Sequence, residues 1–187
     1  MVATTPALSP VKARIVNAAL ELFAEHGVGG TSLQMIADHI NVTKAAVYHQ
    51  YKTKDEIVLA AAEAELARLA AVLDAAAAAG SPDRVREELL VRIVALAVER
   101  RRMESTLLGD PVIVRFFTKY QRHRQVMRRL HRMLMGDDAG PGANVRAAML
   151  LAAIGGAVMH PLVSGLDEDT MRGELLRLAR RFLDLPD

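Results

Sequence analysis

The chain has 187 residues, of which 51% are hydrophobic, 25% are charged and only 4% are aromatic, and its formal net charge is +2. Half-apolar content excludes disorder as the default state, and the absence of cysteine excludes disulfides and thiolate metal sites. The apolar residues are mostly Ala, Leu, Val and Met, which favours an all-α fold. We therefore expect an all-helical cytoplasmic protein that uses no cofactor or metal.

The first helix is predicted from Pro10 to Gly27, because apolar side chains recur there at helical spacing and Gly27 is a typical helix end. A Thr31 or Ser32 cap then starts a short second helix. A helix of only two turns is stable only when it packs on its neighbours. The first two helices are therefore expected to pack together.

The third helix follows after a tight turn. Asn41 is placed where the chain must turn sharply, because Asn tolerates a left-handed backbone. Thr43 caps the helix, which ends near His49. A helix, a tight turn and a second short helix predict a helix-turn-helix, in which the last helix enters the major groove of DNA.

The outward face of this motif has the residue types that bind DNA. Hydroxyl, ammonium and imidazole groups, together with helix N-termini, donate to phosphates. Alanine side chains can contact thymine methyl groups, and base readout by hydrogen bonds must use Lys44, Gln34 or Tyr48, or DNA shape. The expected DNA-binding residues are Thr31, Ser32, Gln34, Thr43, Lys44, Ala45, Tyr48, His49 and Lys54.

The fourth helix is long enough to join two domains. Thr53 and Glu56 form a capping box at its start, and the helix continues to Gly80, a length of roughly 40 Å. We expect a DNA-binding domain over residues 1–53 and a larger helical domain over 54–187. Five more helices are predicted, which brings the total to nine: about 82–106, a short one from Asp110, one that ends at Gly136, 143–163 and 168–184.

The sequence resembles a known family, the TetR-type one-component transcriptional regulators. The resemblance is carried by residues 14–57, RIVNAALELFAEHGVGGTSLQMIADHINVTKAAVYHQYKTKDEI, with the patterns A..LF...G, T.L..IA, V.K..VY and Y..K. Ala46 stands where the family commonly has Ser or Thr, so the operator sequence is not carried over. The resemblance implies a two-domain fold, DNA contacts at Thr31, Lys44, Tyr48, His49 and Lys54, and a ligand-sensing, dimerising remainder.

Family members of this kind dimerise through their last two helices. Small residues at three- and four-residue spacing suit a close helix–helix interface, and the last helix has a matching apolar stripe. Packing within one protomer is the alternative explanation of both stripes. The expected dimer residues are Ala148, Ala152, Gly155, Gly156, Leu175, Leu178 and Phe182.

A ligand pocket is expected between the fifth, seventh and eighth helices. Flexible Met side chains, aromatic rings and a few polar groups suit an apolar or amphipathic ligand, although the same stripe is also typical of a plain core. Arg102 is included because a guanidinium suits an anionic head group. For His160, which precedes Pro161, the alternative role is the cap of a helix kink. The expected ligand-binding residues are Val98, Arg102, Met103, Phe116, Phe117, Tyr120, His123, Met127, Met159 and His160.

A cationic stretch lies between residues 100 and 132, with ten Lys and Arg against Glu104 and Asp110. It has three interpretations: solvated surface, a partner for an anionic ligand, or a second nucleic-acid surface. Residues 147–166 contain no charged residue and could just cross a bilayer. A buried helix is the preferred interpretation of that segment, so no membrane partner is expected.

The function expected from these features is a homodimeric, sequence-specific DNA-binding regulator. It is expected to repress transcription at a palindromic operator until an unidentified small molecule binds, with activation left open. Two alternatives remain. One is a DNA-binding protein of this fold without a ligand, and the other is a helical enzyme, for which His123 with Glu99 is the one acid/base pair to test.

Overall fold

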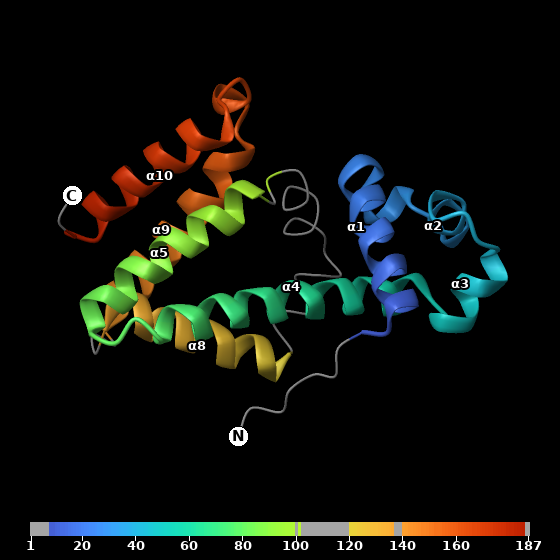
Figure 1. The fold of residues 1–187 in the computed structure, drawn as a ribbon, viewed down its shortest axis with the longest axis horizontal. Coiled ribbons are helices and arrows are strands. Elements are labelled where there is room, and N and C mark those ends of the chain that lie inside the picture. Colours follow the sequence, from blue (N-terminus) through green and yellow to red (C-terminus); the bar gives the residue numbers. More distant parts are fainter. Residues whose placement is uncertain (1–7, 100, 102–119, 137–139, 186–187) are drawn as a thin grey trace. The chain divides into compact units, whose positions relative to one another are not determined.

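The computed structural model describes residues 8–99, 101, 120–136 and 140–185, and these residues contain only helices (Figure 1). The all-α prediction is therefore confirmed. The predicted count of nine is slightly off, and the short helix expected from Asp110 lies outside the described residues. The elements are α1 (Pro10–Gly30), α2 (Leu33–His39), α3 (Lys44–Gln50), α4 (Lys54–Ala77), α5 (Pro82–Glu99), α8 (Gln121–Met135), α9 (Pro141–Met159), the 3-10 helix η1 (Pro161–Val163) and α10 (Glu168–Phe182).

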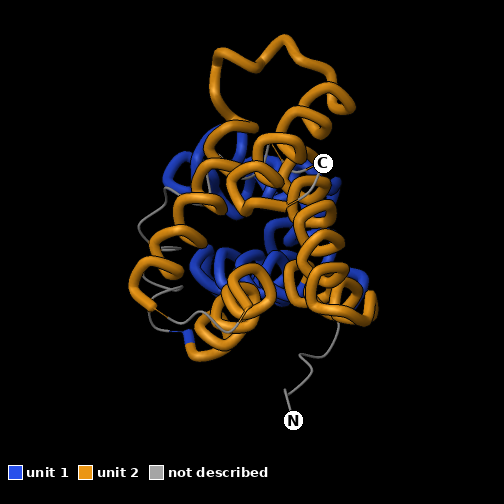
Figure 2. The backbone as a smooth tube through the Cα atoms, turned by 90° about the vertical axis from the view of Figure 1, so that its left-hand side faces the viewer, with its two compact units in different colours: residues 1–67, 105–120 blue, residues 68–104, 121–187 orange. Residues whose placement is uncertain are grey.

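The chain divides into two compact units, shown in different colours in Figure 2. Unit 1 comprises residues 1–67 and 105–120, and unit 2 comprises 68–104 and 121–187. Helix α4 begins in unit 1 and ends in unit 2. The functional division at residue 53 stays a prediction, because compactness alone does not test which residues act on DNA.

Unit 1 has α1, α2 and α3 packed in sequence, since α2 contacts both of the other helices. Phe23, Ile36 and Val47 supply one side chain from each helix, and none of the three is exposed to solvent. Gly27 has a φ of 72° and interrupts α1 three residues before its end, because Gly adopts this backbone without steric cost. The predicted helix end therefore appears as a break inside α1.

Unit 2 is built around α5, which contacts α8, α9 and α10. The three partners present apolar side chains to the core at nearly constant four-residue spacing, as expected for one face of a helix. The buried residues of these partners are Val126, Leu130 and Leu134 of α8, Ala143, Ala147, Leu150, Ile154 and Val158 of α9, and Met171, Leu175 and Ala179 of α10.

Helix α9 ends earlier than predicted. The sequence predicted one helix over 143–163, but α9 stops at Met159 and η1 follows. His160 has extended backbone because it precedes Pro161, whose ring disfavours the α conformation in the residue before it. The Nδ1 atom of His160 accepts a hydrogen bond from the Leu162 N–H and so caps η1.

Helix α9 is also the one described helix long and apolar enough to cross a membrane, by length and composition alone. A core helix passes the same test. One face of α9 is buried in unit 2, while Val145 and Met149 on the opposite face are each 58% exposed. The prediction of a buried helix is therefore correct for only one face.

Candidate functional site

The segment from α2 to α3 has the geometry of a helix-turn-helix. The Ser32 hydroxyl caps α2 by accepting from the Met35 N–H at 3.1 Å, and Asn41 takes a left-handed φ of 56° in the turn. The Thr43 hydroxyl caps α3 by accepting from the Ala46 N–H at 3.2 Å. The backbone N–H of Val42 donates to the Ala37 carbonyl at 2.9 Å, which closes the turn. Sequence-local signals therefore located both caps and the turn.

Helix α3 has one buried side chain, Val47, and all other residues from Lys44 to His49 are exposed. An exposed large aromatic side chain on a short helix is unusual, and Tyr48 is 51% exposed. The Lys52 ammonium lies 4.8 Å from the centre of the Tyr48 ring, a cation–π distance. Lys52 was not among the predicted DNA contacts; its positive charge, four residues after Tyr48, was the available signal.

Three of the predicted DNA contacts on α2 and at the helix caps are exposed to solvent. Ser32, Gln34 and Thr43 are exposed. The Gln34 side-chain amide donates to the Asp38 carboxylate at 2.7 Å, which leaves its carbonyl oxygen as the group that can accept from a base. The structure therefore presents these polar groups together with α3 on unit 1.

Thr31 requires a correction, because its side chain is only 2% exposed. Its hydroxyl donates inward, 2.9 Å from the Gly27 carbonyl and 3.2 Å from the Leu22 carbonyl. Gly27 is the residue that interrupts α1, and Leu22 lies five residues earlier in the same helix. Thr31 therefore holds the break in α1 closed, and its hydroxyl is not available to a phosphate.

Lys54 requires a second correction. Its ammonium donates to the carbonyls of Val28 at 2.7 Å, Thr31 at 3.1 Å and Gly29 at 3.3 Å. An ammonium group has three protons to donate, and these three carbonyls can take all of them. The Lys54 charge is thus used within unit 1, and a phosphate contact no longer follows from its position.

Tyr51, the residue at the C-cap of α3, has a buried hydroxyl that hydrogen-bonds to none of the described residues. Burial raises the pKa of this phenol above its ordinary value of 10.0, and the carboxylates of Glu63 and Glu56 raise it further. The Lys12 ammonium lies 5.3 Å from the ring centre. The phenol is therefore neutral at physiological pH and donates no hydrogen bond to the residues that the structure describes.

Replacing Tyr51 with Phe is expected to stabilise unit 1 by about 1 kcal/mol, because the substitution removes a buried polar group that lacks a partner among the described residues.

The raised pKa of Tyr51 also predicts that the stability of unit 1 depends on pH. Because the folded protein raises this pKa, the phenol ionises more easily in the unfolded chain, so the wild type should lose stability as the pH rises from about 10 through the raised pKa, whereas the Phe variant lacks this loss. Urea unfolding at pH 7 and above pH 10 measures both effects, with Tyr48→Phe as the exposed control. A destabilised Tyr51→Phe would show that the hydroxyl has a partner.

The predicted dimer residues mostly lie on an exposed apolar face of α9 and α10. Ala148, Ala152 and Gly156 are exposed, and Gly155 is half-buried. Leu178 and Phe182 are 53% and 37% exposed. The prediction for Leu175 is wrong, because Leu175 lies in the core of unit 2. Val145 and Met149, which were not among the predicted dimer residues, are also exposed on α9, at four-residue spacing from each other and with Met149 three residues before Ala152.

The predicted ligand residues are only partly brought together. Val98 is buried on α5, while Met127 of α8 and Met159 of α9 are half-buried, and these three helices contact one another. His160 is wrong as a pocket residue, because it is exposed and caps η1. His123 is half-buried, and the Tyr120 hydroxyl donates to the Glu63 carboxylate. The other four, Arg102, Met103, Phe116 and Phe117, lie outside the described residues.

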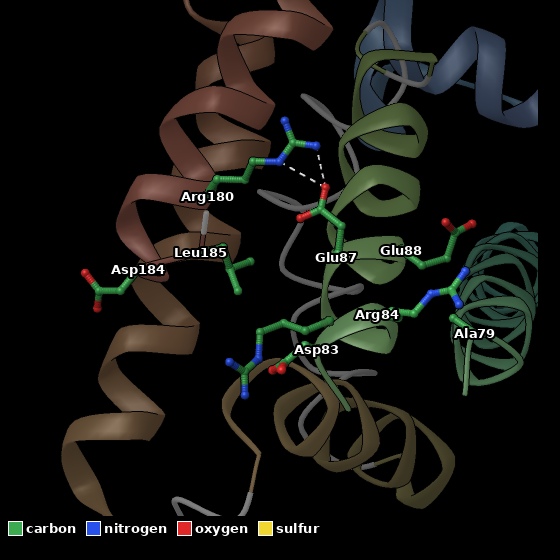
Figure 3. A pocket seen from close by; sticks show the side chains of 9 residues that line it. Ala79, Asp83, Arg84, Glu87, Glu88, Arg180, Asp184 and Leu185 are labelled. Atoms are coloured by element: carbon green, nitrogen blue, oxygen red, sulfur yellow. Dashed lines mark hydrogen bonds and ion pairs between the residues drawn. The ribbon is translucent and has the colours of Figure 1, made fainter. Parts of the chain in front are cut away.

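One cavity of about 620 Å³ lies in unit 2 between the end of α4, the start of α5 and the end of α10. Figure 3 shows Arg180 directed toward Glu87, its ion-pair partner, and Arg84 beside Glu88. This lining is charged with both signs, so the cavity is not the apolar pocket predicted from the sequence. None of the predicted ligand residues lines it.

Most described arginines of the cationic stretch on α8 lie on the surface of unit 2, whereas Arg122 is half-buried. Arg124, Arg128 and Arg132 of α8 are exposed, and Arg129 forms an ion pair with Asp74. Solvated surface is therefore the interpretation that these four arginines favour. Among the residues that the structure describes, no cluster of His, Cys, Asp or Glu could hold a metal ion.

Comparisons with known proteins agree with this geometry. Residues 15–61 match the family model for bacterial regulatory proteins of the tetR family. An HTH-type transcriptional regulator of Bacillus subtilis, YezE, is 27% identical over 68% of this chain and 71% of its own length. The HTH-type transcriptional repressor AcnR of Corynebacterium diphtheriae is 30% identical over 35% of each chain. A solved transcriptional regulator from Aquifex aeolicus is 19% identical, has a TM-score of 0.71 and covers 91% of this chain and 98% of its own.

Proposed function

Because this chain belongs to the tetR family of bacterial regulatory proteins and is a transcriptional regulator, we propose that it represses transcription as a homodimer on a palindromic operator. Regulators of this family bind DNA and dimerise. In this proposal a small apolar or amphipathic molecule releases the dimer from its operator. The protein acts in the cytoplasm, where both the chromosome and the effector are accessible.

The observation that carries the proposal is the exposed side of α3. Thr43 and Lys44 are both exposed at the N-terminus of α3, and an ammonium group at the positive end of a helix attracts phosphate. Tyr48 and Lys52 extend the same polar side to the end of the helix. We assign phosphate contacts to Ser32, Thr43, Lys44, Tyr48, His49 and Lys52.

Base recognition in this proposal depends on few groups. Ala45 and Ala46 are exposed at the start of α3, and their methyl groups can contact only apolar base atoms, of which the thymine methyl is the one in the major groove. Lys44 can donate to guanine O6 and N7, and the Gln34 carbonyl oxygen can accept from a base amino group. Each half-site is therefore expected to contain thymine where α3 begins.

The exposed apolar face on α9 and α10 supports the dimer. Its members are Val145, Met149, Ala152, Gly156, Leu178 and Phe182. A surface of this composition is costly in water and is covered when a second copy presents the same face across a two-fold axis. Two recognition helices related by that axis read a palindrome.

Effector release requires that the molecule bind one conformation better than the other. We propose that it binds among α5, α8 and α9 and acts through α4, because α4 is one continuous helix with residues in both units. Titration of an operator complex with apolar and amphipathic molecules tests this step. If none of them lowers operator affinity, the protein is a DNA-binding regulator without such a ligand.

The proposed function is tested by selecting bound duplexes from a random DNA pool at fixed salt. Wild-type protein is expected to enrich a palindrome. Lys44→Ala and Tyr48→Ala each remove a phosphate contact from both protomers and should lower affinity by at least about tenfold. Arg124→Ala, which removes an exposed cation of α8, should leave affinity unchanged. Enrichment of no sequence by the wild type, or equal binding by the α3 variants, would refute the proposal.

A further inference from the structure

Lys54 connects the first turn of α4 with the junction between α1 and α2. The three carbonyls that its ammonium contacts belong to Val28, Gly29 and Thr31, which lie 23 to 26 residues earlier in the chain. Val28 and Gly29 are in the last turn of α1, and Thr31 directly precedes Ser32, the N-cap of α2. One side chain therefore binds the end of one helix and the start of the next.

The chemistry of this contact is favourable without DNA. Carbonyls in the last turn of a helix lack partners inside that helix and lie at the negative end of its dipole. A cation there accordingly forms charge-assisted hydrogen bonds, which are stronger than neutral ones. Because the contact is partly buried, solvent screens it less than a surface ion pair.

The same turn of α4 also holds the segment that leaves α3. The Thr53 hydroxyl accepts from the Glu56 N–H at 3.2 Å, and the Glu56 carboxylate accepts from the Lys52 N–H at 2.7 Å. The first turn of α4 is thus bonded both to the chain that enters α2 and to the chain that leaves α3. Hydrogen bonds therefore couple this turn to both ends of the helix-turn-helix.

We propose that Lys54 is a positioning residue for DNA binding: its ammonium fixes the α1–α2 junction to α4 and does not neutralise a DNA phosphate. The inference rests on the proposed function, because it concerns how the α2–α3 segment is held for DNA. The contact also couples α4 to α2, since a displacement of the first turn of α4 would move the three carbonyls that Lys54 binds at the α1–α2 junction.

Salt dependence of DNA binding separates the two roles of a lysine. Each phosphate contact contributes about 0.9 to the slope of log affinity against log salt, so Lys44→Met should reduce that slope by about 0.9 per protomer. Lys54→Met should lower affinity by roughly tenfold at fixed salt while the slope stays at the wild-type value. Lys54→Arg should not restore affinity, because a planar guanidinium cannot direct its protons at three carbonyls as an ammonium does. A slope reduced as in Lys44→Met, or full affinity in Lys54→Arg, would overturn the inference.

Hydrogen exchange of the free protein supplies a readout that does not need DNA. Amides of residues 28–39 should exchange on the order of tenfold faster in Lys54→Met than in the wild type, while Lys44→Met should match the wild type. Unchanged exchange in Lys54→Met overturns the inference even if DNA binding is lost. If the wild type binds no DNA while amides of residues 28–39 exchange faster in Lys54→Met, the proposed function is refuted. The contact of Lys54 with the α1–α2 junction is then still supported. If Lys54→Met does not fold, Lys54→Arg replaces it and should show the same faster exchange.

Discussion

Gly156→Glu is expected to separate the dimer into protomers and to weaken operator binding by at least about 100-fold, because each protomer then binds its half-site without the other. Within one protomer a Cβ at Gly156 meets no atom within 4 Å, so the substitution causes no clash inside unit 2. The residue is exposed on α9, on the face assigned to the dimer. A carboxylate placed there would be buried without a partner in the dimer, which is costly.

The matched control for this experiment is Gly173→Glu. Gly173 is an exposed helical glycine of α10 whose Cβ would also meet nothing within 4 Å, and it lies away from the stripe of Leu178 and Phe182. Both substitutions gain about the same helix propensity, so folding stability should change little and similarly. Sedimentation velocity gives the mass of each variant, and fluorescence anisotropy gives its affinity for DNA. A dimeric Gly156→Glu, or a monomeric Gly173→Glu, would contradict the assigned interface.

Phe23→Ala is expected to destabilise the protein by about 3–5 kcal/mol, because it deletes a fully buried aromatic side chain and leaves a cavity in unit 1. That loss is a large fraction of the 5–15 kcal/mol that stabilises a typical domain. Phe23 belongs to α1, on which the helix-turn-helix packs, so DNA binding should be lost together with folding.

Val11→Ala on the same helix is the control for Phe23→Ala. Val11 is 51% exposed, and substitutions of this kind usually change stability by less than about 0.5 kcal/mol. Urea unfolding followed by circular dichroism measures both free energies. A loss below about 1 kcal/mol in Phe23→Ala would mean that unit 1 does not depend on this core.

The N-terminal elements were predicted well because their signals are local. Hydroxyl caps at Ser32 and Thr43 act on backbone groups three residues away, and the left-handed turn at Asn41 needs only that residue. The periodicity of apolar residues located the helices of both units for the same reason. These signals do not depend on what the rest of the chain does.

The roles of individual polar residues were predicted less well. Thr31 and Lys54 fit a DNA-binding pattern by type and position, yet their donors bind carbonyls of α1 and of the α1–α2 junction. His160 was assigned to the pocket as one of its few polar groups, but the alternative role holds, because α9 ends before Pro161 and the imidazole caps η1. A buried donor needs a hydrogen-bond partner, and only the folded chain shows which carbonyl lies within its reach.

The apolar stripes of α9 and α10 were likewise predicted from the sequence only in part. Their spacing determined that each helix would bury one face, but not which apolar residues would fall on it. Packing against α5 buries Leu175 and leaves Val145 and Met149 exposed.

The sequence by itself determined the helices, their caps, the turn and the resemblance to one family, because these follow from short-range hydrogen bonding and periodicity. The tertiary structure decided which polar side chains remain for DNA and which are used inside the protein. It also decided which apolar face remains for a second copy. Both outcomes depend on contacts between residues far apart in the chain, as in the 26 residues between Val28 and Lys54.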